Sequence, residues 1–331
     1  DKQSVLLERV LETLTTLAIA EDRFTTLKEE FRRSLENSSK DRPYQQGFSQ
    51  LTDTLLESSW PADAMMTELE QLTRPALAAW RDEYFSEVNV EGLMVGNVDE
   101  QDASAIQQTL REQLSLAPGT DRRPAVTQIK DRTDMKLEID HDDAMMVIYA
   151  QNDDDSLKSR ASSSLLVHLL RPKYFTSLRT EQQLGYVVTA IQAEYENQGG
   201  VGFVIQSPVA SAQTLVDRTT QFLDWQREAL TSLEAEAFGE AKAGLIAEIL
   251  EKDKNLGSRA GRYWSDLDEG IMTFDGREQI AAAIAALSQA ELMTFFEQVT
   301  EKINDRPLFI WSQGKFAASE SEAEATPAPQ L

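Results

Sequence analysis

Residues 174–188 read YFTSLRTEQQLGYVV and are the most informative stretch of the chain. Its first half has the pattern of a short helix, and its second half runs without a break into the pattern of a strand. Arg179 and Tyr186 stand on either side of the junction. Their side chains can converge only if the backbone turns between Gln183 and Gly185, and a glycine there makes a sharp turn possible. The stretch therefore predicts a helix-to-strand connection with an arginine before it and a tyrosine after it.

Sequence patterns on both sides of this stretch predict an α/β domain. Two strand-like runs, 184–195 and 201–207, are separated by Asn-Gln-Gly-Gly at 197–200, which is a hairpin signal. The continuous apolar run 144–150 is typical of a strand that is covered on both faces. Two other strands are predicted, over 125–139 and 308–311. Helices are predicted over 157–171 and 215–230, and in two further segments up to 268. A last helix is predicted to begin after Ser288, where Glu291 completes a capping box.

The region before residue 118 is mainly helical in pattern. Apolar residues recur at helical spacing over 7–17, 24–35, 48–55, 77–84 and 106–114, and one short apolar run at 92–97 predicts a strand. Two prolines and no large apolar residue make 118–124 the best candidate linker.

An internal repeat connects the two regions. Five residues recur about 214 positions later: Phe24, Lys28, Phe31, Leu35 and Lys40 correspond to Phe238, Lys242, Leu245, Ile249 and Lys254. Both blocks lead through helices to a predicted strand that ends in glycine, Gly96 or Gly314. The second copy is preceded by its own strands, whereas the first is not. We therefore expect the sheet of the first domain to be incomplete and the chain to begin inside a domain.

Charge and cofactor chemistry exclude several classes of function. The chain has 56 acidic and 32 basic residues, which gives a net charge of −24. This charge disfavours nucleic acid or an anionic membrane as a partner. There is no cysteine, and the two histidines, His141 and His168, stand alone. A catalytic zinc takes three protein ligands, and the usual pattern for a helix-borne site is His-x-x-Glu-His or its reverse. We therefore expect no metal site in this chain and no peptidase activity from it alone.

The sequence Leu-Arg-Thr followed by Gln-Leu-Gly-Tyr resembles a signature in the C-terminal half of the inverzincin metalloproteases. These are the pitrilysin and insulin-degrading-enzyme family, peptidase family M16. The resemblance implies an α+β fold of repeated domains, each a mainly antiparallel sheet flanked by helices. Residues 1–117 would be the back of a third domain, 118–316 a fourth domain, and 317–331 a disordered tail. It also implies zinc in an absent N-terminal half, peptide substrates degraded in a closed chamber, and a periplasmic location, as in bacterial members.

Three site residues follow from the resemblance. Tyr186 would donate a hydrogen bond to the oxyanion that develops on the scissile carbonyl, and Arg179 would bind substrate carbonyls nearby. Phe175 would help to line the pocket just after the scissile bond. Without the resemblance, the same residues would be a core aromatic, a solvated helix end and a packing residue.

Two other functions remain open at this point. An inactive relative could serve as a peptide-binding or scaffold subunit, and an intact zinc motif elsewhere in the protein would distinguish the peptidase from it. A free-standing helical interaction module explains the helices but not the strand-rich middle of the chain.

Overall fold

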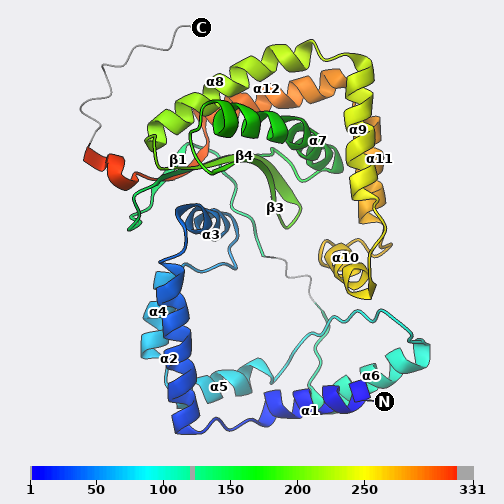
Figure 1. Cartoon of the computed structure of the whole chain (residues 1–331). Helices are drawn as coiled ribbons and strands as arrows, with labels where there is room; N and C mark the ends of the chain where they lie inside the picture. The colour runs from blue at the N-terminus through cyan, green and yellow to red at the C-terminus, as the bar shows by residue number, and fades with distance from the viewer. Residues whose placement is uncertain (1, 120–123, 319–331) are drawn as a thin grey trace. The chain divides into compact units, whose positions relative to one another are not determined.

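The computed structural model describes residues 2–119 and 124–318, so most of the predicted tail and linker lies outside the described residues. The chain forms two compact units (Figure 1). The first comprises Asp1–Asn37, Ala62–Arg123 and Asp253–Phe274; the second comprises Ser38–Pro61, Pro124–Lys252 and Asp275–Leu331. Each unit therefore contains segments from both halves of the sequence.

A five-stranded mixed sheet forms the centre of the second unit. Its strands are β1 (Thr133–Lys136), β2 (Ala144–Gln151), β3 (Val187–Tyr195), β4 (Gln198–Ser207) and β5 (Leu308–Ser312), in the spatial order β1-β5-β2-β4-β3. Only β1 and β5 pair in parallel, and the other pairs are antiparallel. The predicted α+β class with a mainly antiparallel sheet is confirmed.

Helices cover both faces of this sheet (Figure 1). The helices α7 (Leu157–Tyr174), α8 (Ala212–Thr231) and α12 (Gln289–Asp305) pack on one face, where Met146 and Ile148 of β2 are buried. The helix α3 (Pro43–Leu55) packs on the other face, with Leu51 and Leu55 buried against Met145, Val147 and Tyr149. Because β2 is buried along its whole length, it carries the continuous apolar run found in the sequence, and β4 is buried along its whole length too.

The remaining helices of the second unit are α9 (Ala235–Ile249) and α11 (Gly276–Ala286), which pack on each other and on α7. The first unit is helical in its described residues. It contains α1 (Lys2–Thr16), most of α2 (Glu21–Ser38), α4 (Ala62–Gln71), α5 (Arg74–Tyr84), α6 (Glu100–Gln113) and α10 (Leu256–Asp268).

The strand predicted at 92–97 is not formed, and this prediction was wrong. The segment is extended without regular structure, and Leu93, Met94 and Val95 are half-buried. A strand needs neighbouring strands to accept and donate its backbone hydrogen bonds. Among its described residues the first unit supplies only an isolated bridge between Val88 and Leu116.

Two further predictions need correction in the second unit. The strand expected over 125–139 is limited to β1, preceded by irregular chain. The hairpin turn consists of Glu196 and Asn197, which have positive φ of 47° and 69°, instead of residues 197–200. Gly200 lies inside β4, where a Cβ atom would come within 2.3 Å of the Tyr149 ring, so close packing explains this glycine.

The internal repeat is visible as equivalent contacts. In the first copy the Lys28 ammonium donates to the carbonyl oxygens of Glu70 (2.9 Å) and Leu72 (2.8 Å), at the end of α4. In the second copy Lys242 donates to the carbonyl oxygens of Ala285 and Leu287, both at 2.8 Å, at the end of α11. Two lysines that are 214 positions apart thus make equivalent contacts: Lys28 joins α2 to the end of α4, and Lys242 joins α9 to the end of α11.

The two copies exchange equivalent segments between the units. Residues 38–61, which carry α3, belong to the second unit, and residues 253–274, which carry α10, belong to the first. The helices α3 and α10 are both 13 residues long. The domain boundary predicted at residue 117 stays a prediction, because each compact unit contains one helix from the other copy.

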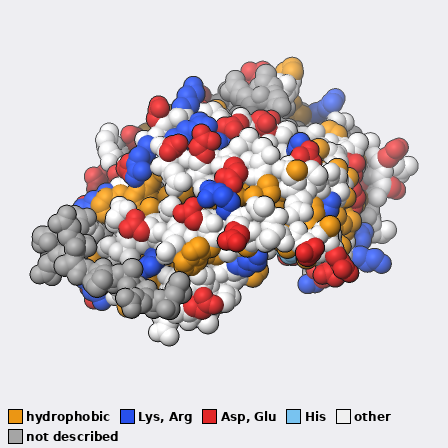
Figure 2. All heavy atoms as spheres, turned by 90° about the horizontal axis from the view of Figure 1, so that it is seen from above, with side chains coloured by type: hydrophobic (Ala, Val, Ile, Leu, Met, Phe, Trp, Pro, Cys, Tyr) orange, Lys and Arg blue, Asp and Glu red, His pale blue; other side chains and the backbone are white. Residues whose placement is uncertain are grey.

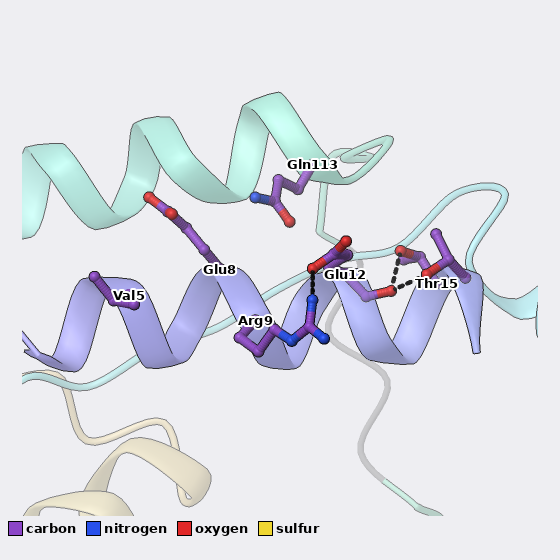
Figure 3. Close-up of a pocket in the computed structure, with 7 residues that line it drawn as sticks. Val5, Glu8, Arg9, Glu12, Thr15 and Gln113 are labelled. Carbon is purple, nitrogen blue, oxygen red and sulfur yellow. Dashed lines mark hydrogen bonds and ion pairs between the residues drawn. The ribbon is translucent and has the colours of Figure 1, made fainter.

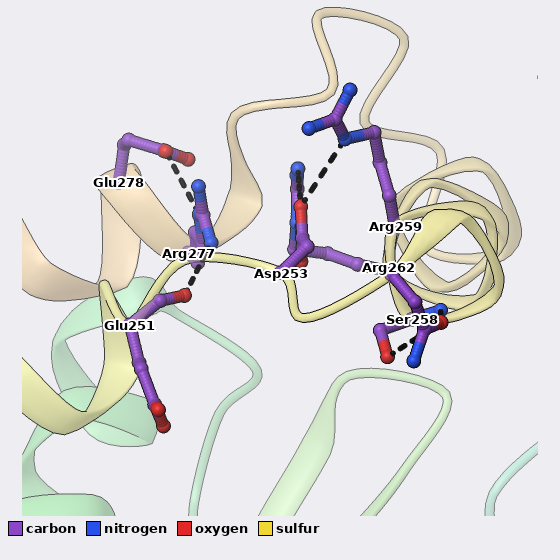
Figure 4. A network of polar contacts seen from close by, with 8 residues as sticks. Glu251, Asp253, Ser258, Arg259, Arg262, Arg277 and Glu278 are labelled. Atoms are coloured by element: carbon purple, nitrogen blue, oxygen red, sulfur yellow. Dashed lines mark hydrogen bonds and ion pairs between the residues drawn. The ribbon is translucent and has the colours of Figure 1, made fainter. Parts of the chain in front are cut away.

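Two arginines make polar contacts near the start of the 253–274 segment (Figure 4). Within the first unit, the guanidinium of Arg262 holds both carboxylate oxygens of Asp253, at 3.2 and 2.9 Å, and so ties α10 to the segment that leads into it. Within the second unit, Arg277 at the start of α11 donates to the carbonyl oxygen of Glu251, just beyond α9, at 3.0 Å.

The surface matches the acidic composition. Figure 2 shows acidic side chains interspersed with basic ones on the visible face, without a large patch of one sign.

In the described part of the chain, no single helix is long and apolar enough to cross a membrane. The helices α11 and α12 meet the length and hydropathy criterion only as a pair bent by 102°.

Candidate functional site

The helix before the junction ends as a π-helix. After α7 the chain continues as a π-helix over Phe175–Glu181, a form that is rare and often found at functional sites. Tyr174 and Leu178 are fully buried and anchor it, and the Tyr174 hydroxyl lies 2.7 Å from that of Thr219. Phe175 and Arg179 are exposed, and the guanidinium carbon of Arg179 lies 5.2 Å from the centre of the Phe175 ring. The π-helix therefore presents Phe175 and Arg179 together, as a cation–π pair.

The turn expected between Gln183 and Gly185 is present, but its parts have different roles. The positive φ of 54° falls on Gln183, a residue type for which this conformation is unusual. Gly185 is required for close approach, because a Cβ atom there would lie 2.0 Å from the carbonyl oxygen of Gln206. The amide of Leu184 closes the connection by donating to the carbonyl oxygen of Leu178 at 2.9 Å.

Tyr186 lies directly before β3, which is an edge strand of the sheet. Its side chain is 46% exposed, so it is not the core aromatic considered as the alternative. The phenol oxygen accepts a hydrogen bond from Gln206 Nε2 at 2.6 Å. Partial burial raises the pKa of Tyr186, and the negative charge of Asp143 raises it further, against a lowering effect of Arg42. The phenol is therefore held in its protonated form, as a hydrogen-bond donor requires.

Gln206 connects Tyr186 to the interior of the second unit. This side chain is fully buried on β4 and donates to the Asp143 carboxylate at 2.8 Å, while its carbonyl oxygen accepts from the backbone amide of Tyr44 at 3.2 Å. Sequence reasoning did not select Gln206 or Asp143. The available signal was an amide within the apolar run 201–207, which has to find partners once it is buried.

The three predicted site residues form two groups. Phe175 contacts Arg179, and Tyr186 contacts Gln206, but no hydrogen bond joins Arg179 to Tyr186 among the described residues. All three side chains are substantially exposed. Their chemical roles remain predictions.

The residues present do not fit a bound zinc ion. Across residues 2–119 and 124–318, no three His, Cys, Asp or Glu side chains come together as a metal site. His141 lies in a turn, where its Nδ1 accepts from the backbone amide of Asp143 at 2.9 Å. His168 is half-buried on α7.

A groove of about 460 Å³ lies between α1 and α6 of the first unit (Figure 3). Polar and charged side chains form most of its wall, and several are already bonded within α1. Arg9 pairs with Glu12 at 2.5 Å, and the Thr15 hydroxyl donates to the carbonyl oxygen of Leu11 at 2.9 Å. The groove contains none of the predicted site residues, and the site around Tyr186 belongs to the second unit.

Two family models match the chain. The model described as the middle or third domain of peptidase M16 matches residues 1–68, and the model described as PQQ synthase PqqF-like, C-terminal lobe domain 4, matches residues 165–264. The fold and these matches define the class: the chain is related to the M16 peptidases, with the third-domain match preceding the fourth-domain match.

Proteins with similar sequences belong to the same class. Human insulin-degrading enzyme is 27% identical over 310 residues, covering 90% of this chain and 30% of its own length. Protease 3 of Escherichia coli strain K12 is 27% identical over 297 residues, covering 88% of this chain and 31% of its own length. The chain thus spans about a third of the length of these relatives.

Solved structures show the same fold. The crystal structure of pitrilysin matches with a TM-score of 0.83 at 22% identity, over 99% of this chain and 35% of that protein. An inactive M16 peptidase domain from Pseudomonas fluorescens matches with a TM-score of 0.68 at 15% identity, over 94% of this chain and 75% of that protein.

Proposed function

We propose that this chain is the C-terminal, non-zinc part of a zinc metalloendopeptidase that degrades peptides and small proteins in a closed chamber. Zinc and its ligands belong to an N-terminal half, and this part closes the chamber and supplies groups that bind substrate. The proposal includes a periplasmic location, which rests on the resemblance to bacterial members alone.

In this proposal the chain contributes fixed hydrogen-bond donors. As the scissile carbonyl becomes tetrahedral, its oxygen gains negative charge, and Tyr186 donates to it from the edge of the sheet. Arg179 binds substrate carbonyl groups before and during the reaction, and Phe175 provides an apolar wall next to it. Donors aimed at charge that appears only in the transition state raise kcat more than they tighten substrate binding.

One observation carries this proposal: the phenol of Tyr186 is 46% exposed and yet fixed by a hydrogen bond from a buried amide. A solvated tyrosine without function needs no such support, and a core tyrosine would be buried. The relation to M16 peptidases supplies the reaction in which a fixed phenol is useful.

Tyr186→Phe tests the proposal in the chain joined to a zinc-bearing N-terminal half. This change removes only the hydroxyl, so we expect kcat for peptide hydrolysis to fall by about 10²-fold with little change in KM, as for the loss of one oxyanion donor. Arg179→Ala should lower kcat and raise KM, because it also removes contacts that exist before the chemical step. An unchanged kcat in the Phe variant, at an unchanged melting temperature, would remove Tyr186 from the mechanism.

A second candidate function is a non-catalytic M16 subunit that binds peptides or a partner. It is favoured by the similarity in fold to an inactive M16 domain. Metal analysis of the complete protein distinguishes the two. One zinc per molecule, with peptide hydrolysis that is lost on chelation, supports the peptidase; no zinc and no hydrolysis support the subunit.

A further inference from the structure

Both amide hydrogens and the amide oxygen of Gln206 take part in hydrogen bonds. The side chain is fully buried on β4, its Nε2 donates to Asp143 at 2.8 Å and to Tyr186 at 2.6 Å, and its Oε1 accepts from the Tyr44 amide at 3.2 Å. A buried polar group without a partner destabilises the folded state, so an arrangement that gives partners to both amide hydrogens and to the oxygen is strongly preferred.

The chemistry of its neighbours determines which way this amide faces. The Asp143 carboxylate can only accept, and the backbone amide of Tyr44 can only donate. The nitrogen of Gln206 must therefore face Asp143, and its oxygen must face Tyr44. The second amide hydrogen is left for Tyr186, so the phenol oxygen acts as the acceptor of that bond.

An oxygen that accepts from Gln206 has its own hydrogen free to point elsewhere. Tyr186 is 46% exposed, so its hydroxyl group is accessible to a bound ligand. We propose that Gln206 is a positioning residue, which holds the Tyr186 hydroxyl so that its hydrogen points toward a bound substrate. This inference rests on the proposed function, because it is for an oxyanion that such orientation matters.

The helix α3 completes the support. Pro43 begins α3, and the Tyr44 amide is one of the first-turn donors that have no partner inside a helix. Gln206 satisfies this donor, and in return α3 fixes the oxygen end of the Gln206 amide. A segment from the first copy of the repeat thereby stabilises the group that orients Tyr186, a residue in the second.

A double-mutant cycle in the enzyme assembled with its zinc-bearing half tests this role. Gln206→Met keeps the volume and removes every polar bond, and we expect it to lower kcat roughly tenfold, less than the loss of the donor itself. In the Tyr186→Phe background the same change should lower kcat no further, because Gln206 acts through the phenol. If the two changes lower kcat independently, so that their factors multiply in the double variant, the inference is overturned in favour of a structural role for Gln206.

Gln198→Met is the matched control. Gln198 is also a buried amide on β4, but it donates to the carbonyl oxygen of Asn152. We expect it to lower the melting temperature as Gln206→Met does while leaving kcat unchanged. If Gln206→Met does not fold, Gln206→Asn replaces it, since an amide shortened by one carbon cannot reach all three partners and should show the same dependence on Tyr186.

Titration of Tyr186 in the chain alone separates this inference from the proposed function. An amide hydrogen bond stabilises phenolate more than phenol, so Gln206→Met should raise the pKa of Tyr186, and Asp143→Asn should lower it by removing a negative charge. Labelled tyrosine rings, with Tyr186→Phe for assignment, give these values by NMR. An unchanged pKa in Gln206→Met would overturn the orientation, whereas an unchanged kcat in Tyr186→Phe would overturn the proposed function.

Discussion

The two copies of the repeat have equivalent helices but unequal surroundings. Phe24 and Phe238 are both buried, at 8% and 7% exposed, and Lys28 and Lys242 make the same pair of carbonyl bonds. One turn further on, Phe31 is 48% exposed whereas Leu245 is 8% exposed. The local helix pattern is thus repeated in both copies, but the position of Phe31 and Leu245 is buried only in the copy that carries the sheet.

The exchanged helices show the same difference more sharply. On α3, a Cβ atom at Gly47 would lie 2.9 Å from both Met145 and Val147 of the sheet. At the position 214 residues later, Gly261 on α10 has no atom within 4 Å of the equivalent point. The helix α3 approaches a sheet so closely that only glycine fits, and the described residues of the first unit provide no sheet for α10.

The largest expected effect comes from this glycine pair. Gly47→Ala gains helix propensity of about 1 kcal/mol, but overpacking against the stiff Val147 costs about 1–3 kcal/mol, so we expect a net loss of up to about 2 kcal/mol. Gly261→Ala has no such contact and should stabilise α10 by about 0.5–1 kcal/mol. Urea unfolding, with hydrogen exchange to follow β2 and α10 separately, measures both. Changes of the same sign at the two sites would contradict the comparison.

An effect of intermediate size should be shared by both copies. Lys28→Met and Lys242→Met each remove two bonds to carbonyl oxygens at a helix end, and each should lower the free energy of unfolding by about 1 kcal/mol. Equal losses would strengthen the view that the copies are built alike. The exposed Lys173, replaced by Met, serves as a control with little expected effect, and a large difference between the two variants would argue against the repeat.

The smallest effect depends on pH and should appear in the second copy alone. Ser288 and Glu291 cap α12 as a capping box, whereas at the equivalent place Thr73 caps α5 through its hydroxyl only, with Ala76 in the position of Glu291. Lys158 and Ser288 lower the pKa of Glu291 from 4.5 to about 2. This contribution to stability is present above pH 4.5 and is lost as the pH falls through about 2.

Melting temperatures at a series of pH values test this difference. Glu291→Gln should lower the melting temperature near neutral pH, and the difference from the parent chain should disappear at the acidic end of the range. The loss caused by Thr73→Ala should be independent of pH, because no titrating group takes part. A constant difference for Glu291→Gln would contradict the assigned cause.

The short-range features of the chain could be predicted from its sequence. Helical spacing located most helices, the apolar run at 144–150 identified a central strand, and two strand-like runs around a polar turn predicted the β3–β4 hairpin. Arg179 and Tyr186 were placed correctly, before and after a turn. These features depend on residues close in sequence, whose periodicity reports directly which side of an element is buried.

Features that depend on long-range contacts could not be predicted in this way. The run at 92–97 has the composition of a strand, but no neighbouring strand pairs with it among the described residues. Gly185 is needed because the backbone passes close to Gln206, whereas the positive φ falls on Gln183. The exchange of α3 and α10 leaves no local sequence signal, because an amphipathic helix does not specify the sheet it covers.

From the sequence alone, most helices, the β3–β4 hairpin, the internal repeat and the resemblance to a peptidase family could be inferred. The folded structure was needed to show that α3 of the first copy covers one face of the sheet in the second, and that Gln206 links Tyr44, Asp143 and Tyr186. The physical reason is that a hydrogen bond between Tyr44 and Gln206 joins residues 162 positions apart, and such a pairing depends on how the whole chain packs.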